Sequence, residues 1–129
     1  MLPEVMETVA GPGLTRQTAR LAGFRRRCLR GAVYPGLVPA AGECTEGVVW
    51  EGLGARTLAR IDRFEGALYE RSLHAVELAD GTVREAFVYV LRPGEYERAG
   101  PSPWDEADFR KHHLTAYLRG CRAFARENP

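Results

Sequence analysis

The amino-acid sequence predicts an α+β domain, and three observations support that prediction. An Asp-Gly pair separates two strand-like runs within residues 69–91, which is the pattern of a β-hairpin. Residues 55–64 carry Leu58 and Ile61 at the i, i+3 spacing of an amphipathic helix. A longer amphipathic pattern begins at Ser102 and continues almost to the end of the chain. The 129 residues have the length of one domain, which we expect to span residues 1–129.

The N-terminal part is expected to hold one short helix followed by strands. Residues Pro3 to Ala10 suit a helix, which Gly11-Pro12-Gly13 would end. Ala19 to Val33 suit one strand or two short ones. Two prolines and a glycine within Tyr34 to Pro39 predict an ordered loop rather than a central strand. Glu43 to Trp50 then predict a further strand.

The central part is expected to contain the helix over 55–64 and then the hairpin. Gly66 is the expected C-terminal stop of the helix. The hairpin strands are Tyr69 to Leu78 and Thr82 to Leu91, joined across Ala79-Asp80-Gly81. A two-residue Asp-Gly turn is preferred there, with φ positive at both positions. The second strand is apolar on both faces from Ala86 onward, so it predicts a central strand or a barrel wall covered by helices.

The C-terminal helix has clear signals at its beginning. Ser102 is the expected N-cap, Pro103 suits the first helical position, and Asp105 and Glu106 would complement the helix dipole. The residues expected on its apolar face are Ala107, Leu114, Tyr117, Leu118, Cys121, Phe124 and Ala125.

Charge and hydropathy argue against nucleic-acid and membrane partners. The net charge is only +1, whereas a nucleic-acid-binding protein usually carries a larger positive excess. The one local cluster, Arg25 to Arg27 with Arg30, fits a solvated strand face. No apolar run approaches the roughly 20 residues that cross a bilayer. The N-terminal residues lack a signal-peptide pattern, so the cytoplasm is the expected compartment.

Metal and cofactor motifs are not found. Cys28, Cys44 and Cys121 lie far apart, which argues against a disulfide framework and against zinc. The adjacent His112 and His113 would diverge on a helix. Glycine-rich phosphate motifs and a Gly-x-Ser-x-Gly nucleophile motif are both missing.

Glu65 is the carboxylate whose local sequence suggests chemistry. It ends the amphipathic helix directly after the apolar Phe64, and Gly66 would allow a sharp turn. A carboxyl pointing inward there would be partly buried, and its raised pKa would suit a general base near neutrality. The bare sequence favours the alternative, a glutamate at a helix end in contact with solvent.

Several segments resemble the gamma-glutamylcyclotransferase-like family, in particular its avirulence-induced plant-protein-like branch. They are Tyr34-Pro35-Gly36-Leu37-Val38-Pro39, Gly47-Val48-Val49-Trp50, the stretch from Leu58 to Arg71, Asp80-Gly81 and Ala86-Phe87-Val88-Tyr89-Val90. The most specific of them is D-x-F-E-G-x-x-Y-x-R at Asp62 to Arg71, and the C-terminal helix is also similar. This resemblance implies a small mixed β-barrel flanked by helices.

The resemblance also implies a reaction. A free γ-glutamyl group would cyclise to 5-oxoproline and release an amine, with Glu65 as general acid and base and with no metal or cofactor. Tyr69, the loop Tyr34-Pro35-Gly36 and Tyr89 would contribute to substrate binding, although core packing also explains the tyrosines. A plain Asp-Gly hairpin pairs Ser72 with Tyr89, which puts Tyr69 and Tyr89 on opposite faces. A bulge would be needed to bring both into one pocket.

The family's N-terminal Y-G-T-L type strand has no counterpart in this sequence. Either the gene model begins at an internal methionine, or the protein lacks that strand and its backbone N–H donors. The alternative function is therefore a catalytically degenerate member that binds a small anionic metabolite or a protein partner. The expected partner of the enzyme is a small-molecule γ-glutamyl substrate, such as glutathione, a γ-glutamyl amino acid, a γ-glutamyl-lysine crosslink or an antibiotic precursor. The sequence does not indicate an oligomeric state.

Overall fold

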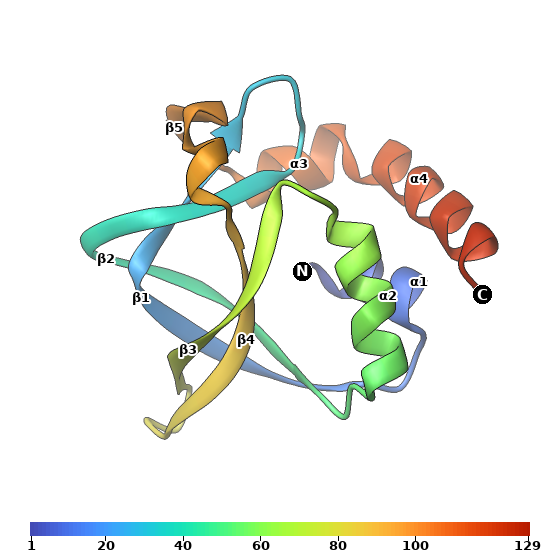
Figure 1. The fold of residues 1–129 in the computed structure, drawn as a ribbon, viewed down its shortest axis with the longest axis horizontal. Coiled ribbons are helices and arrows are strands. Elements are labelled where there is room, and N and C mark those ends of the chain that lie inside the picture. Colours follow the sequence, from blue (N-terminus) through green and yellow to red (C-terminus); the bar gives the residue numbers. More distant parts are fainter.

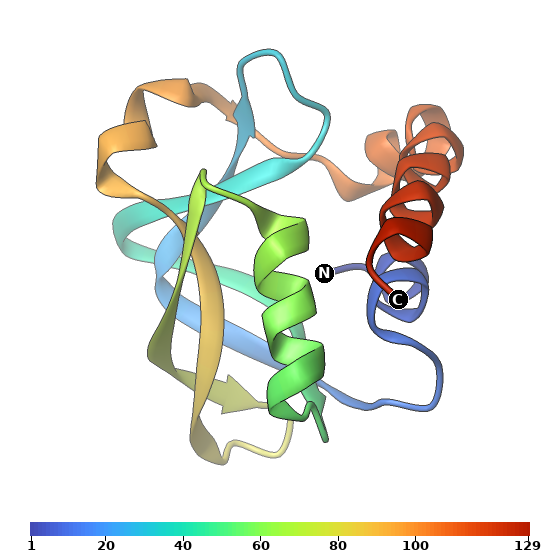
Figure 2. The same cartoon turned by 45° about the vertical axis from the view of Figure 1, so that its right-hand side comes forward.

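The computed structural model describes residues 1–129 as a curled antiparallel sheet with helices gathered along one side (Figures 1 and 2). Helices α1, α2 and α4 lie together on that side, and the amino terminus lies beside them (Figures 1 and 2). None of the helices is long and apolar enough to cross a membrane. The elements in chain order are α1 (Pro3–Ala10), β1 (Thr15–Leu29), β2 (Pro35–Glu51), α2 (Ala55–Glu65), β3 (Tyr69–Leu78), β4 (Val83–Leu91), the 3₁₀ helix η1 (Pro93–Arg98), β5 (Ala99–Pro103), α3 (Glu106–His112) and α4 (Leu114–Glu127).

The sheet confirms the α+β class, but it is open rather than a closed barrel. Its strand order is β2-β1-β3-β4, with β5 paired to β1, and all of these pairs are antiparallel. The outermost strands β2 and β4 contact each other without backbone pairing. The curl therefore resembles a barrel whose last seam is not hydrogen-bonded.

The loop expected at Tyr34 to Pro39 is wrong, because β2 begins at Pro35 and continues to Glu51. Pro35 pairs with Cys28 and Pro39 pairs with Phe24. Proline cannot donate to a ladder, but a strand at the end of a sheet tolerates it. Strand β2 pairs with β1 alone, so its other edge needs no N–H donors. The expected strand at Glu43 to Trp50 is the second half of β2.

The β3–β4 hairpin is present, but its turn contains three residues. The Leu78 N–H donates to the Thr82 carbonyl at 2.8 Å, and the Gly81 N–H donates to the Leu78 carbonyl at 2.9 Å. Only Gly81 in this loop has a positive φ, of +85°, so Asp80 does not have the φ that a two-residue turn requires. The extra residue shifts the register by one, and Arg71 rather than Ser72 pairs with Tyr89.

This register corrects the expected placement of the two tyrosines. Arg71 and Tyr69 are two residues apart on β3 and share a face, and Tyr89 lies opposite Arg71. Tyr69 and Tyr89 are therefore on the same face without a further bulge. The prediction of a central strand at Ala86 to Leu91 is wrong in detail, because β4 ends the strand order and Phe87 is 52% exposed.

The single C-terminal helix predicted from Ser102 is also wrong. Ser102 and Pro103 belong to β5, where Pro103 pairs with Arg27 of β1. The helix cap is Asp105, whose side chain accepts the Asp108 N–H at 3.2 Å. Pairing with β1 thus outcompetes the local capping signal. His113 separates the pattern into α3 and α4.

Three apolar clusters hold these layers together. One joins α1, α2 and α4, a second lies between β1 and β3, and a third lies where β1, β2, β3 and β4 meet. The buried members of the first cluster are Val5, Met6, Val9, Ile61 and Cys121. Those of the second are Ala19, Leu21, Val76 and Leu78, and those of the third are Leu29, Val38, Tyr69 and Leu91. The first cluster fixes the inward face of α2.

Candidate functional site

Glu65 is the last residue of α2, and the helix face that it shares points inward. Ile61 lies four residues earlier on that face and is almost fully buried, with 1% exposure. Gly66 ends the helix with φ +79°, and its N–H donates to the Asp62 carbonyl at 3.1 Å. The glycine lets the chain turn directly into β3. The carboxyl is thus held on a rigid helix rather than on a loop.

Burial raises the pKa of Glu65 from 4.5 to about 7. The α-amine of Met1 opposes this shift, and the negative charge of Asp62 adds to it. Burial in turn lowers the pKa of the Met1 amine, while Glu65 acts to raise it. Near neutral pH the Glu65 carboxyl can therefore exist in both protonation states, as a group that both accepts and returns a proton must.

Three tyrosines, Tyr34, Tyr69 and Tyr117, form a cluster beside Glu65. The rings of Tyr34 and Tyr117 lie 6.1 Å apart. Burial chiefly raises the pKa values of Tyr69 and Tyr117, and the charges of Glu65 and Tyr34 raise both further. The tyrosine cluster brings β3, α4 and the segment just before β2 together around one carboxyl. The raised pKa values keep the Tyr69 and Tyr117 hydroxyls protonated near neutral pH, so both can donate hydrogen bonds.

The segment Tyr34-Pro35-Gly36 reaches this cluster at the start of β2. The Tyr69 hydroxyl donates to the Pro35 carbonyl at 2.6 Å. At Gly36 an added Cβ would lie 2.9 Å from a methyl carbon of Leu29 and 3.4 Å from one of Leu91. Glycine is therefore needed for the close approach of β2 to its neighbours. Pro35 and Gly36 shape the site through their backbone, whereas Tyr34 presents a side chain.

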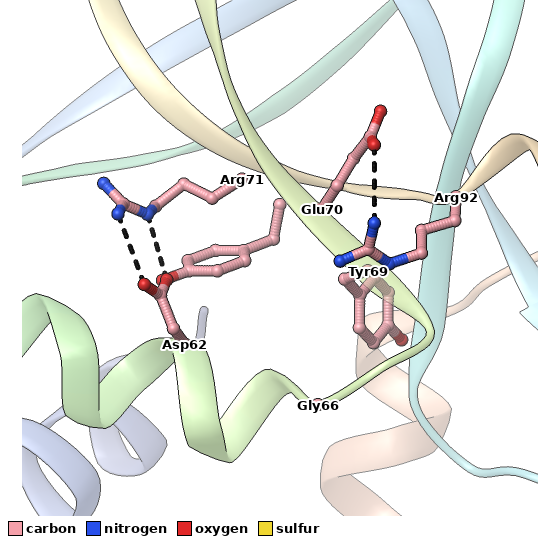
Figure 3. Close-up of a pocket in the computed structure, with 7 residues that line it drawn as sticks. Asp62, Gly66, Tyr69, Glu70, Arg71 and Arg92 are labelled. Carbon is pink, nitrogen blue, oxygen red and sulfur yellow. Dashed lines mark hydrogen bonds and ion pairs between the residues drawn. The ribbon is translucent and has the colours of Figure 1, made fainter.

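Tyr89 belongs to a second group around Asp62, one helical turn before Glu65. The Tyr89 hydroxyl donates to Oδ1 of Asp62 at 2.5 Å. Arg71 grips the same carboxylate with Nε on Oδ1 at 2.9 Å and Nη2 on Oδ2 at 3.2 Å (Figure 3). Asp62 thereby accepts three hydrogen bonds from two strands. We refer to Asp62, Arg71 and Tyr89 as the Asp62 group.

A cavity of about 350 Å³ opens beside the Asp62 group (Figure 3). Charged and polar side chains dominate its wall, and Glu70 and Arg92 form a loose ion pair there at 3.7 Å. Its lining residues are Asp62, Gly66, Tyr69, Glu70, Arg71, Tyr89 and Arg92. Tyr69 and Gly66 connect this cavity to Glu65, which is not itself among the lining residues.

The structure thus divides the expected site residues between two neighbouring groups. Tyr34 and Tyr69 gather around Glu65 together with the Pro35 carbonyl, while Tyr89 binds Asp62. Sequence reasoning gave no role to Asp62, Arg71 or Tyr117. The first two lie inside the D-x-F-E-G-x-x-Y-x-R motif, so the motif itself contained the signal. Tyr117 was expected only on the apolar face of a helix.

The sequence matches a family model described as gamma-glutamyl cyclotransferase, AIG2-like, over residues 1–111. Among curated proteins it is similar to AIG2-like protein D of Arabidopsis thaliana, with 28% identity over 116 residues, 85% of this chain and 73% of that protein. AIG2-like protein C of the same plant is 28% identical over 127 residues, 95% of this chain and 71% of that protein. The chain therefore spans about three quarters of these relatives.

Two solution structures of Arabidopsis thaliana proteins share the fold. One has a TM-score of 0.68 at 24% sequence identity and covers 92% of this chain and 80% of its own. The other has a TM-score of 0.67 at 24% identity and covers 100% of this chain and 79% of its own. Together, the family match and the shared fold establish that the chain belongs to the gamma-glutamyl cyclotransferase, AIG2-like family.

Proposed function

We propose that this protein is a cyclotransferase that converts a free γ-glutamyl group to 5-oxoproline and releases an amine. The observation that carries the proposal is the pKa of about 7 at Glu65, on a helix end that faces three tyrosines. Family membership supports the same chemistry. The proposal is further supported by the D-x-F-E-G-x-x-Y-x-R motif, whose glutamate is Glu65 and for which the family resemblance implies an acid/base role.

The reaction needs one proton carrier and a fixed substrate shape. Ionised Glu65 accepts a proton from the substrate's α-ammonium, and the free amine attacks the γ-carbonyl carbon. A ring C–N bond forms, and a tetrahedral oxyanion results. As the oxyanion collapses and the original amide C–N bond breaks, protonated Glu65 gives its proton to the leaving nitrogen. The ring nitrogen then gives its second proton to the Glu65 carboxylate, which passes it to the released amine and returns to its ionised form. The attack is intramolecular, so holding the reactive rotamer supplies much of the acceleration.

The tyrosine cluster supports this chemistry by shape and hydrogen bonding. The Tyr69 hydroxyl is already committed to the Pro35 carbonyl, so its ring acts as a wall that is fixed in place. Tyr34 and Tyr117 make no hydrogen bond within the protein through their hydroxyls, and they are the donors available to substrate. A site built from packed aromatic rings also excludes water, which would otherwise solvate the reactive amine.

The experiment is an assay of 5-oxoproline release from γ-glutamyl amino acids, γ-glutamyl-ε-lysine and glutathione. Glu65→Ala removes the proton carrier and is expected to abolish release with every substrate that the native protein cleaves. Glu43→Gln is the matched control, because Glu43 lies on β2 in an ion pair with Arg25. The proposal fails if Glu65→Ala releases 5-oxoproline as fast as the control does.

A binding role without catalysis is the second candidate. Arg71 and Arg92 in the cavity wall, each paired with a carboxylate of the protein, are the groups that would contact the carboxylate of a small anionic metabolite. In that case the native protein releases no 5-oxoproline from any substrate, yet small carboxylates bind it measurably by calorimetry. The expected cytoplasmic location stays a prediction under either function.

A further inference from the structure

We propose that the Asp62 group is a positioning device for Glu65, in which Arg71 and Tyr89 hold Asp62 and thereby orient the last turn of α2. This inference rests on the proposed function and gives a positioning role to residues that do not take part in the reaction themselves. Asp62 and Glu65 are three residues apart, so they project from the same side of the helix. Whatever fixes Asp62 therefore also fixes the direction of Glu65.

The hydrogen bonds show how firmly Asp62 is held. Arg71 makes a bidentate contact, which fixes a planar guanidinium against a planar carboxylate. Tyr89 approaches the same carboxylate from β4 at 2.5 Å. The three donors come from two paired strands whose register places Arg71 opposite Tyr89. Helix α2 is thus clamped to the hairpin one turn before the catalytic carboxyl.

Arg71 is itself braced, so the clamp is not a loose surface ion pair. Its guanidinium carbon lies 4.4 Å from the ring centre of Phe87, the residue opposite Leu73 on the same face. A guanidinium over an aromatic face gains a cation–π attraction. The Arg71 side chain is 27% exposed and the Asp62 side chain 39%. Ion pairs exposed to solvent usually contribute little to stability. The Asp62–Arg71 pair belongs to the stronger kind, because its contact is bidentate, the guanidinium stacks on Phe87 and Asp62 also binds Tyr89.

The same arrangement has an electrostatic consequence. Asp62 presents a negative charge near Glu65, and Arg71 balances that charge. Removing the negative charge of Asp62 should lower the pKa of Glu65. Removing Arg71 should raise the pKa of Glu65, because the negative charge of Asp62 is then no longer balanced. The titratable and charged groups that bear on Glu65, directly or through Asp62, are the Met1 amine before α1, Tyr34 before β2, Asp62 on α2, Tyr69 and Arg71 on β3, Tyr89 on β4 and Tyr117 on α4.

The test compares Asp62→Asn with Arg71→Met. Asparagine keeps the shape and the Tyr89 contact but loses the charge. We expect the acid limb of the kcat/KM profile to move to lower pH in Asp62→Asn and to higher pH in Arg71→Met, by about half a unit or more each. Tyr89→Phe, which changes no charge, should lower kcat and leave the limb in place. Glu43→Gln, from the ion pair between β1 and β2, should change neither.

A direct titration separates this inference from the proposed function. NMR of side-chain carboxyl carbons measures the Glu65 pKa without substrate, so it works in a protein without activity. Opposite shifts in the two variants uphold the inference even if no 5-oxoproline is released. Shifts of the same sign, or none beyond those of Glu43→Gln, overturn it while leaving a catalytic Glu65 intact. If Arg71→Met does not fold, the Glu65 pKa in Asp62→Asn decides alone: a lower pKa than in the native protein upholds the inference, and an unchanged or higher pKa overturns it.

Discussion

Burial of its carboxyl sets the pKa of Glu65, and the residues next to it in the chain only partly predict that burial. The helix end, the glycine that follows and the apolar Phe64 could all be recognised in the sequence. The sequence could not show whether the Glu65 carboxyl points inward, because a glutamate at a helix end before a glycine can equally well face solvent. The packing of Ile61 against α1 and α4 decides the matter, and that contact joins residues far apart in the chain.

The raised pKa of Glu65 predicts how stability depends on pH. The folded pKa of about 7 lies above the unfolded value of 4.5, so between these values the folded protein binds more protons. Stability from this group is therefore lost as the pH rises from about 4.5 to 7. Glu65→Gln cannot ionise and should be more stable than the native protein at pH 8, by on the order of 2 kcal/mol, and about equally stable at pH 4. Urea unfolding at both pH values measures the difference.

The Tyr69 hydroxyl predicts a smaller, purely structural effect. Tyr69→Phe removes the hydroxyl that donates to the half-buried Pro35 carbonyl, which should cost about 1 kcal/mol of unfolding free energy. Tyr34→Phe is the matched control, since the Tyr34 hydroxyl has no partner within the protein, and it should change stability little. Denaturant unfolding of both variants checks this. Equal losses would show that the Tyr69 contact contributes nothing.

At the scale of elements, local signals predicted most helices and strands and failed where pairing between distant segments decided. The helix Pro3–Ala10, the end of α2 at Gly66 and the strand Tyr69–Leu78 were predicted with their observed bounds. The predicted helix cap at Ser102 is wrong because Ser102 belongs to β5, which pairs with β1. The predicted loop at Tyr34 to Pro39 is wrong because the residues from Pro35 onward belong to β2, which also pairs with β1. The connection at Ala79-Asp80-Gly81 was predicted, but the pairing of Ser72 with Tyr89, deduced from a two-residue Asp-Gly turn, is wrong by one residue because Arg71 pairs with Tyr89.

The hairpin turn predicts a test of its own at this scale. Gly81→Ala forces an alanine into φ near +85° and should destabilise the protein by about 1 kcal/mol. Gly94→Ala is the control, because Gly94 has no positive φ and an added Cβ there meets nothing within 4 Å. Thermal unfolding of the two variants measures the contrast. A Gly81→Ala protein as stable as Gly94→Ala would contradict the positive φ of Gly81 in the turn.

At the scale of the whole molecule, the site lies where the helical layer meets the curled sheet. Glu65 comes from the end of α2, Tyr34 from the segment just before β2, Tyr69 from β3 and Tyr117 from α4. The family resemblance predicted strands flanked by helices, but it could not predict that β2 and β4 would leave the sheet open. The role that the resemblance implies for Glu65 stays a prediction. Closing the barrel would require backbone hydrogen bonds between β2 and β4, which are far apart in the sequence, so no local sequence pattern predicts whether they form.

Two core substitutions test whether the helical layer positions the site. Ile61→Ala should cost about 3 kcal/mol and also lower kcat, because Ile61 seats α2 below Glu65. Val76→Ala, in the cluster between β1 and β3, should cost about 2 kcal/mol and leave kcat unchanged when assayed well below its melting temperature. Chemical unfolding and the 5-oxoproline assay together separate the two effects. Equal kcat in both variants would contradict a positioning role for the layer.

The central claim, that Glu65 carries the proton, is tested most directly by the rate of 5-oxoproline formation in Glu65→Gln. Glutamine keeps the size and polarity of the side chain but cannot exchange a proton. We predict a loss of about 10²-fold to 10⁴-fold in kcat at pH 8, where native Glu65 is ionised, and a native profile that rises through about pH 7. A Glu65→Gln protein that forms 5-oxoproline at the native rate would contradict the claim.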